Sequence, residues 1–187
     1  MTKNQARLTA AATLATAALA VGAAPALAAD SVSQAVTAGT RTASVADLAL
    51  TTKAYSHSAQ TSTGSMTLTA DDSTGSNAGW NVTIQSSAFV YTGGNGGSNV
   101  AATGFALTSA AAPAMTAGQA VDVTGGPLVP STSPVGTLDQ PRKTVQATTT
   151  FGNGTYIQAL GVALTIPAQS AAGTYTGTLT TTIAAAP

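Results

Sequence analysis

The sequence predicts an all-β protein, an antiparallel β-sandwich of the immunoglobulin-like or jelly-roll-like kind, and three observations support this fold class. Only 6% of the 187 residues are charged, and the helix-favouring residue glutamate is absent. Apolar residues recur at every second position over much of the chain. Clusters of Gly, Asn, Asp and Ser separate these runs at short intervals. A small closed β-barrel is the alternative that the same pattern allows.

Residues 1–28 have the pattern of an export signal. Lys3 and Arg7 precede an apolar run that ends at Val21, and Ala26-Leu27-Ala28 is a sequence that signal peptidases accept. The run is shorter than the roughly 20 apolar residues that a membrane-spanning helix needs. We therefore expect cleavage after Ala28, export of the remaining chain, and no membrane span after cleavage. A retained membrane anchor is the alternative.

The charge and cysteine content exclude several classes of protein. Once residues 1–28 are removed, four Lys and Arg residues remain against six aspartates, so no basic surface is available to hold the phosphates of a nucleic acid. The chain has no cysteine. Disulfide frameworks, thiol chemistry and zinc–thiolate sites are therefore excluded.

The exported part divides into a short leader and one domain. Residues 29–42 show only weak alternation, and we expect a loose N-terminal segment that becomes ordered only on pairing with a sheet. Residues 43–187 carry the strand pattern and are numerous enough to bury a core without covalent cross-links. No internal repeat of fixed period is visible, which disfavours solenoids and propellers.

Alternation of apolar and polar residues predicts the strands in order along the chain. In the clearest run, Trp80, Val82 and Ile84 share one face while Asn81 and Thr83 share the other. In the last run, threonines alternate with larger side chains, and we expect the threonine row to face water. The inward residues of the predicted strands are Leu48 and Leu50; Met66 and Leu68; Trp80, Val82 and Ile84; Phe89 and Tyr91; Phe105 and Leu107; Val121 and Val123; Tyr156, Leu160, Val162, Leu164 and Ile166; and Tyr175, Leu179 and Ile183.

The segments between these runs have the composition of turns and loops. Asp71–Gly79, Gly93–Gly97 and Gly152–Gly154 are rich in residues that tolerate left-handed backbone or bond their own main chain. The proline-rich stretch Pro127–Pro141 is predicted to be an extended surface connection rather than a strand. Ser109–Ala120 is Ala-rich, but it contains a proline and a glycine, so we expect at most one helical turn there.

Two stretches together carry a recognisable pattern. The first is Met66-Thr67-Leu68-Thr69-Ala70-Asp71-Asp72-Ser73-Thr74-Gly75, followed by Gly79-Trp80-Asn81-Val82-Thr83-Ile84. The second is Leu164-Thr165-Ile166-Pro167-Ala168, followed by Ala172-Gly173-Thr174-Tyr175-Thr176-Gly177-Thr178-Leu179-Thr180. Together they resemble the WxL family of bacterial cell-surface domains, with Val82 at the Leu position of the Trp-x-Leu signature. Trp80 is the only tryptophan, so there is no second signature.

The resemblance implies a non-covalent attachment to peptidoglycan or to other surface proteins, and it makes Trp80, Asn81 and Val82 the candidate binding residues. Trp80 has two interpretations. Its large apolar face suits stacking on a sugar ring. Its position beside Val82 and Ile84 suits packing in the core instead, and this spacing favours the core.

Two further groups of side chains are candidates for chemistry. Asp71 and Asp72 are a possible calcium site, since hard cations prefer several oxygen ligands, but the alternative is an Asp-led turn because no regular Asp-x-Asp-x-Asp spacing is present. His57 is the only histidine, and no Gly-x-Ser-x-Gly elbow exists. We therefore expect no enzymatic activity, no catalytic residues and no required cofactor.

The function expected from the sequence is that of a secreted, non-enzymatic protein on the cell surface or cell wall. It would attach non-covalently to peptidoglycan or to other surface proteins. No Leu-Pro-x-Thr-Gly sorting signal follows the last strand, so covalent anchoring to the wall is not expected. The alternative is a structural subunit that self-associates, in which residues 29–42 and the threonine-rich edges add to a neighbour's sheet.

Overall fold

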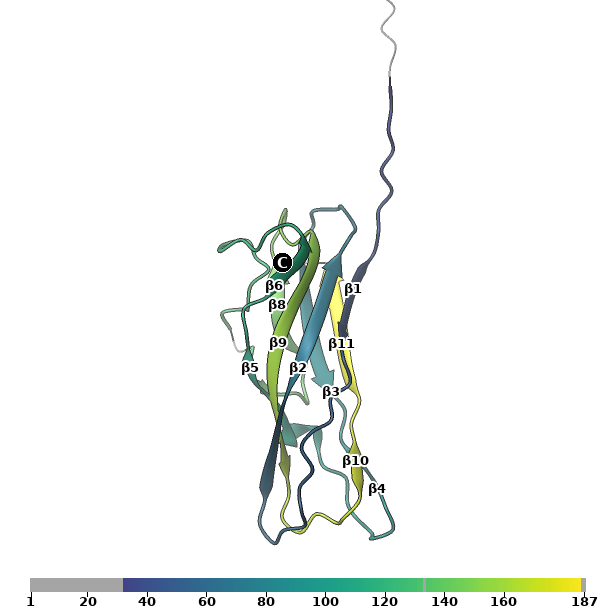
Figure 1. The fold of residues 1–187 in the computed structure, drawn as a ribbon, viewed down its shortest axis with the longest axis vertical. Helices are drawn as coiled ribbons and strands as arrows, with labels where there is room; N and C mark the ends of the chain where they lie inside the picture. The colour runs from purple at the N-terminus through teal and green to yellow at the C-terminus, as the bar shows by residue number, and fades with distance from the viewer. Residues whose placement is uncertain (1–31, 133, 186–187) are drawn as a thin grey trace, which may run out of the picture. The chain divides into compact units, whose positions relative to one another are not determined.

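The computed structural model of the protein describes residues 32–132 and 134–185, so the expected export signal lies outside the described residues. Residues 32–35 are exposed and have no regular structure. The residues from Val36 onward form one compact unit, and it is built almost entirely of antiparallel strands (Figure 1). The predicted all-β sandwich fold is confirmed.

Two sheets face each other in the sandwich, and a short two-stranded sheet lies at one end. The first sheet has the order β1-β2-β9-β5-β7, with β6 also paired to β9, and the second has the order β11-β3-β8. The first sheet contains β1 (Arg41–Val45), β2 (Gln60–Asp72), β5 (Phe105–Ala110), β6 (Ala114–Gly118), β7 (Gly136–Thr137) and β9 (Gly154–Ile166). The second contains β3 (Trp80–Ser86), β8 (Arg142–Ala147) and β11 (Leu179–Ala185); the short sheet pairs β4 (Val90–Thr92) with β10 (Thr174–Thr176), and a 3-10 turn, η1 (Ala102–Gly104), precedes β5.

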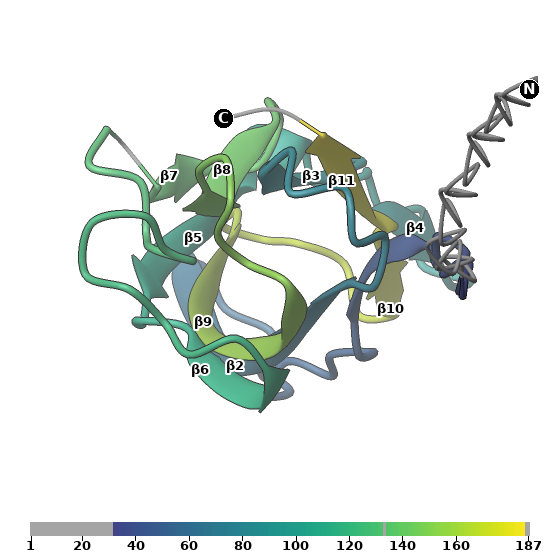
Figure 2. The ribbon, with the colours of Figure 1, turned by 90° about the horizontal axis from the view of Figure 1, so that it is seen from above.

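The pair β2–β9 is the longest ladder of the fold. It runs without a register shift from Gln60 opposite Ile166 to Asp72 opposite Gly154. Even-numbered residues of both strands point inward, as the period-two pattern predicts. Seen from above, β2, β6 and β9 lie on one side of the sandwich, and β3, β8 and β11 lie on the other (Figure 2).

The core lies between the two sheets and contains the only tryptophan. Trp80 of β3 is fully buried, and its ring centroid lies 6.0 Å from that of Tyr156 on β9. Each fully buried aliphatic side chain stabilises the fold by about 1.5–3 kcal/mol relative to leaving it exposed. The buried apolar residues are Met66, Leu68, Ala70, Trp80, Val82, Ile84, Phe89, Val100, Phe105, Leu107, Leu138, Val145, Ala147, Tyr156, Leu160, Val162 and Leu164.

The expected strand at Leu48 and Leu50 is not formed. Residues 46–59 belong to no strand, although both leucines are partly buried against the core. The reason lies in β2: a Cβ on Gly64 would come within 3.0 Å of the Leu50 side chain and 3.2 Å of Leu48. The two leucines therefore cover the gap that this glycine leaves, and their alternation arises from packing rather than from a hydrogen-bonded ladder.

Two other local expectations are corrected. Val121 and Val123 form no strand, because the Asp122 carboxylate accepts hydrogen bonds from the main chain of Thr124 and Gly125, which closes a turn. Val123 is consequently 87% exposed. The Ala-rich stretch at 109–120 contains the end of β5 and the whole of β6, both paired with β9, instead of a helical turn.

The proline-rich connection is not the extended surface segment that its composition predicts, because it contains the short strand β7 and is partly buried. Leu138 within it is fully buried, and so is Pro127. The Leu138 amide donates to the Phe105 carbonyl (2.8 Å), while the Leu138 carbonyl accepts from the Ser86 amide (2.8 Å). The main chain of Leu138 thus connects one residue of each sheet through hydrogen bonds. The proline-rich sequence does not predict these hydrogen bonds.

The two ends of the sandwich domain also differ in detail from the expectation. The sequence pattern predicts that the loose leader ends at residue 42, but β1 begins at Arg41. Gly39 and Thr40 already form main-chain hydrogen bonds with Ser73. The last predicted strand is divided at residues 177–178: β10 pairs with β4, and β11 pairs with β3. Its faces are nevertheless as expected, with exposed threonines alternating with partly buried Tyr175, Leu179 and Ile183.

Candidate functional site

Trp80 and Val82, two of the three binding residues suggested by the resemblance, lie in the core and have no exposed surface. The Trp80 indole Nε1 donates to the Gly152 carbonyl (2.8 Å), so its polar atom is satisfied internally. Asn81 is partly exposed on the other face of β3. No ligand can stack on Trp80 while the sandwich is closed, so the core position that its spacing favours is the one observed.

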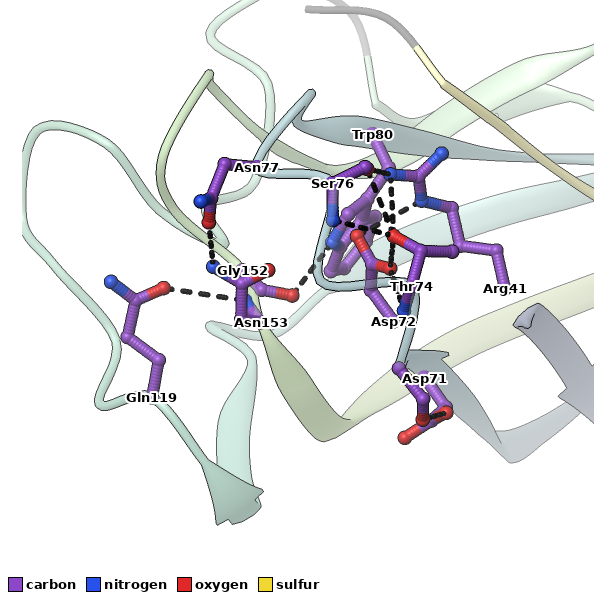
Figure 3. A network of polar contacts seen from close by, with 11 residues as sticks. Arg41, Asp71, Asp72, Thr74, Ser76, Asn77, Trp80, Gln119, Gly152 and Asn153 are labelled. Carbon is purple, nitrogen blue, oxygen red and sulfur yellow. Dashed lines mark hydrogen bonds and ion pairs between the residues drawn. The ribbon is translucent and has the colours of Figure 1, made fainter. Parts of the chain in front are cut away.

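Trp80 is instead part of a polar network that joins three loops (Figure 3). The side-chain Nδ2 of Asn153 donates to Oδ1 of Asn77 (2.8 Å). The main-chain N–H of Asn153 donates to Oε1 of Gln119 (3.2 Å). Gly152, which receives the indole hydrogen bond, precedes Asn153 directly. The network holds the three loops to the buried indole.

The carboxylates of Asp71 and Asp72 are engaged by protein groups. Asp72 pairs with Arg41 (Nε to Oδ2, 2.9 Å) and accepts from the hydroxyl and amide of Thr74 (2.6 and 3.0 Å). Asp71 accepts from the Thr155 hydroxyl (2.6 Å) and from Ser73. Among the described residues no group of three or more acidic or histidine side chains is placed to hold a metal ion. These contacts are those of an Asp-led turn (Figure 3).

The Asp72 contacts predict a loss of stability in acid. Burial raises the pKa of Asp72, but the hydrogen bonds from Thr74 and the Arg41 charge together leave that pKa below its ordinary value of 3.8. The folded state therefore binds this proton less readily than the unfolded state, so the stability is present above the unfolded pKa and is lost as pH falls through the folded pKa. Asp72→Asn should cost about 1–2 kcal/mol at neutral pH.

Urea unfolding between about pH 7 and 2 checks this prediction. The decline of unfolding free energy with acid should be shallower in Asp72→Asn than in the parent chain. Arg41→Gln is the control, since it keeps the Thr74 hydrogen bonds and should retain part of the decline. An unchanged pH profile in Asp72→Asn would contradict the account.

The β4–β10 sheet lies at the lower end of the ribbon in Figure 1. A cleft of about 520 Å³ is lined in part by residues of β10. This volume is in the range of clefts that hold small ligands. Its rim is residues 50–56, here called the strap, and its back wall is residues 166–175. The lining residues are Leu50, Thr51, Thr52, Lys53, Ala54, Tyr55, Ser56, Gln60, Ser62, Val100, Leu164, Ile166, Pro167, Ser170, Ala171, Ala172, Gly173, Thr174 and Tyr175.

The strap has no regular structure, and side chains of β2 hold it in place. Ser62 donates to the Thr51 carbonyl (2.8 Å), and Gln60 donates to the Ala54 carbonyl (2.7 Å). At the far end of the strap, the Ser56 carbonyl accepts from the amide of Gln169 in the back wall (2.8 Å). Three hydrogen bonds therefore fix the rim relative to the sheet and to the opposite wall.

The back wall is fixed by tyrosines of the short sheet. Tyr175 donates to the Ala171 carbonyl (2.8 Å), and its ring lies 5.2 Å from that of Tyr91. Tyr91 donates to the Ala172 carbonyl (2.9 Å), which also accepts from the Asn95 side chain (2.8 Å). The glycine-rich loop at 93–97 thus holds the back wall through the hydrogen bond from Asn95. These contacts form the cleft without a ligand.

The cleft combines an exposed aromatic ring with neutral polar groups. Tyr55 is 57% exposed, and the ring of His57 meets it edge-on at 5.2 Å. The other polar side chains of the lining are hydroxyls and one amide, with Lys53 as the only charged group. Such a surface offers stacking and many hydrogen bonds rather than acid–base chemistry.

A second cleft, of about 490 Å³, lies between the end of β1 and the start of β11. Its aromatic residues, Phe89 and Phe105, are only 9% and 5% exposed. It therefore offers a ligand little aromatic surface, and the cleft beside Tyr55 is the stronger candidate.

The sequence pattern predicts the strands that carry some of the lining residues, but it does not predict the cleft. Leu164, Ile166 and Tyr175 belong to the second stretch that carries the WxL resemblance. In the strap, the sequence pattern assigns only Leu50 to the inward face of a strand, and it does not single out Tyr55. The signal available was an aromatic residue within a polar stretch that has no alternating apolar partner.

Comparison of the chain with protein-family models, with curated proteins and with solved structures finds no match. Within residues 32–132 and 134–185, no helix has the length and apolar character needed to cross a membrane.

Proposed function

We propose that this protein is a secreted, non-enzymatic surface protein that binds a glycan of the bacterial cell wall non-covalently through the cleft beside Tyr55. The observation that carries the proposal is an exposed aromatic ring over a preformed cleft of neutral polar groups. Sugar rings present apolar C–H faces to an aromatic ring and hydroxyls to surrounding hydrogen-bonding groups. The resemblance to WxL domains supports the same proposal, because its second stretch forms the back wall.

The charge balance favours attachment by short-range contacts. Without residues 1–28, the chain carries fewer cations than aspartates, so long-range attraction to an anionic wall cannot supply the affinity. Stacking and hydrogen bonds inside a cleft are weakly screened by salt. Retention on the wall should therefore be resistant to salt.

Tyr55→Ala should weaken binding to isolated wall material by about tenfold or more, because tyrosines that a ligand covers on binding are frequent hot spots. Binding of the parent chain should persist through washes at about 0.5 M salt, where the range of charge interactions is only a few ångströms. Sedimentation with wall material, followed by quantification of the bound fraction, measures both effects.

Two variants control this experiment. Tyr55→Phe keeps the ring and should retain most of the binding. Ile157→Ala removes an apolar side chain that is 39% exposed on β9 and does not line the cleft, so it should bind like the parent chain. Full retention by Tyr55→Ala, or release of the parent chain by salt, would refute the proposal.

The second candidate function is a structural subunit joined by strand pairing. Among the described residues, β1 pairs only with β2 and β11 pairs only with β3, so each leaves one edge without a ladder. Deleting residues 29–38 tests this idea while keeping the hydrogen bonds of Gly39 and Thr40 with Ser73. Concentration-dependent polymers that disappear on this deletion, together with wall retention by Tyr55→Ala, would favour assembly.

A further inference from the structure

Lys53 is the one lining residue of the cleft whose side chain is charged at neutral pH. No aspartate lines the cleft. Within the described part of the chain, the only ion pair joins Arg41 to Asp72, and Lys53 has neither an ion pair nor a hydrogen bond. Lys53 is exposed, so water solvates its ammonium group, and it carries the only charge beside an otherwise neutral cleft.

The backbone around Lys53 is fixed rather than free. The carbonyls of Thr51 and Ala54, on either side of it, accept the hydrogen bonds from Ser62 and Gln60 described above. Tyr55 follows two residues later in the same strap and lines the same cleft. One fixed segment thus presents an aromatic ring and a cation to a single ligand.

We propose that the glycan bound in this cleft is an acidic one, in which a carboxylate or phosphate group pairs with Lys53 while Tyr55 stacks on the sugar ring. This inference rests on the proposed function. A neutral sugar offers the exposed ammonium only hydroxyls in place of water, whereas an acidic group forms a charge-assisted hydrogen bond with it, which is shorter and stronger than a neutral one.

A single charge contact is compatible with salt-resistant attachment. It supplies only one counterion-sensitive interaction, while stacking and the neutral hydrogen bonds remain at high salt. Lys53 would therefore determine which glycan is chosen, and the neutral contacts would supply most of the affinity. The chain's excess of aspartates elsewhere makes this local cation more important for an anionic ligand.

Calorimetric titration with three soluble probes tests the inference: neutral tri-N-acetylglucosamine, trigalacturonate and a short glycerol-phosphate oligomer. The parent chain should bind at least one acidic probe about three- to tenfold more tightly than the neutral one. The two acidic probes distinguish a carboxylate from a phosphate. Lys53→Gln should abolish this preference.

Lys143→Gln is the matched control, because it removes the same charge from β8, outside the cleft. It should keep the preference for the acidic probe. Equal affinity for all probes, no binding of either acidic probe, or a preference that survives Lys53→Gln would each overturn the inference. Loss of wall retention in Tyr55→Ala is measured separately, so the proposed function stands or fails independently of these outcomes.

Discussion

Replacing Trp80 with alanine should lower the free energy of unfolding by about 3–5 kcal/mol, the range for removing a large aromatic side chain from a packed core. The Trp80 ring is fully buried against Tyr156, and its loss leaves a cavity between the two sheets. It also removes the donor that satisfies the Gly152 carbonyl. A loss of this size is a large fraction of the roughly 5–15 kcal/mol that stabilises a typical domain.

Urea unfolding followed by far-ultraviolet circular dichroism measures the effect. Tyr55→Ala is the control, since it truncates an exposed aromatic side chain and should change stability by no more than about 0.5 kcal/mol. Equal unfolding midpoints for the two variants would show that the indole does not anchor the core.

Gly152→Ala should have the second largest effect, a loss of about 2–5 kcal/mol. Gly152 has φ of +82°, a conformation that costs a residue with a Cβ about 1–2 kcal/mol. A Cβ there would also lie 2.6 Å from Nε1 of Trp80 and 2.5 Å from the Cβ of Ala147, and overpacking costs about 1–3 kcal/mol more. The same urea titration gives the difference in unfolding free energy.

Gly75→Ala is a matched control for the steric part. Gly75 has φ of +64°, but a Cβ there would meet no atom within 4 Å. It should therefore show only the backbone cost, about 1–2 kcal/mol. If the two alanine variants are equally stable, the contact between Gly152 and the indole does not constrain the core.

The parts of the fold that the sequence predicts are those governed by local alternation. The burial of Trp80, Val82 and Ile84 follows directly from the period of two, because one face of β3 is apolar and the opposite face is polar. The same holds for β9, where even-numbered residues are buried. The faces of the last run are correct for the same reason, although its division into two strands is not visible in composition.

The parts that the sequence does not predict depend on contacts between distant residues. Leu48 and Leu50 alternate like strand residues, but they form no strand. Their side chains pack over Gly64 of β2, where no side chain is present. The main chain of Leu138 forms hydrogen bonds with Phe105 of one sheet and Ser86 of the other, and its side chain is buried. A proline-rich composition does not indicate this position. The candidate cleft is the clearest case, since its rim and back wall are brought together only by hydrogen bonds such as that from Gln169 to Ser56.

The burial of the only tryptophan determines what optical signals from this protein mean. Its indole lies in the core and is not among the residues that line the cleft. Tryptophan fluorescence will therefore report whether the two sheets are packed together. It should change very little when a ligand binds in the cleft. Occupancy has to be followed through the tyrosines or by heat, and a titration that leaves the emission unchanged carries no information about binding.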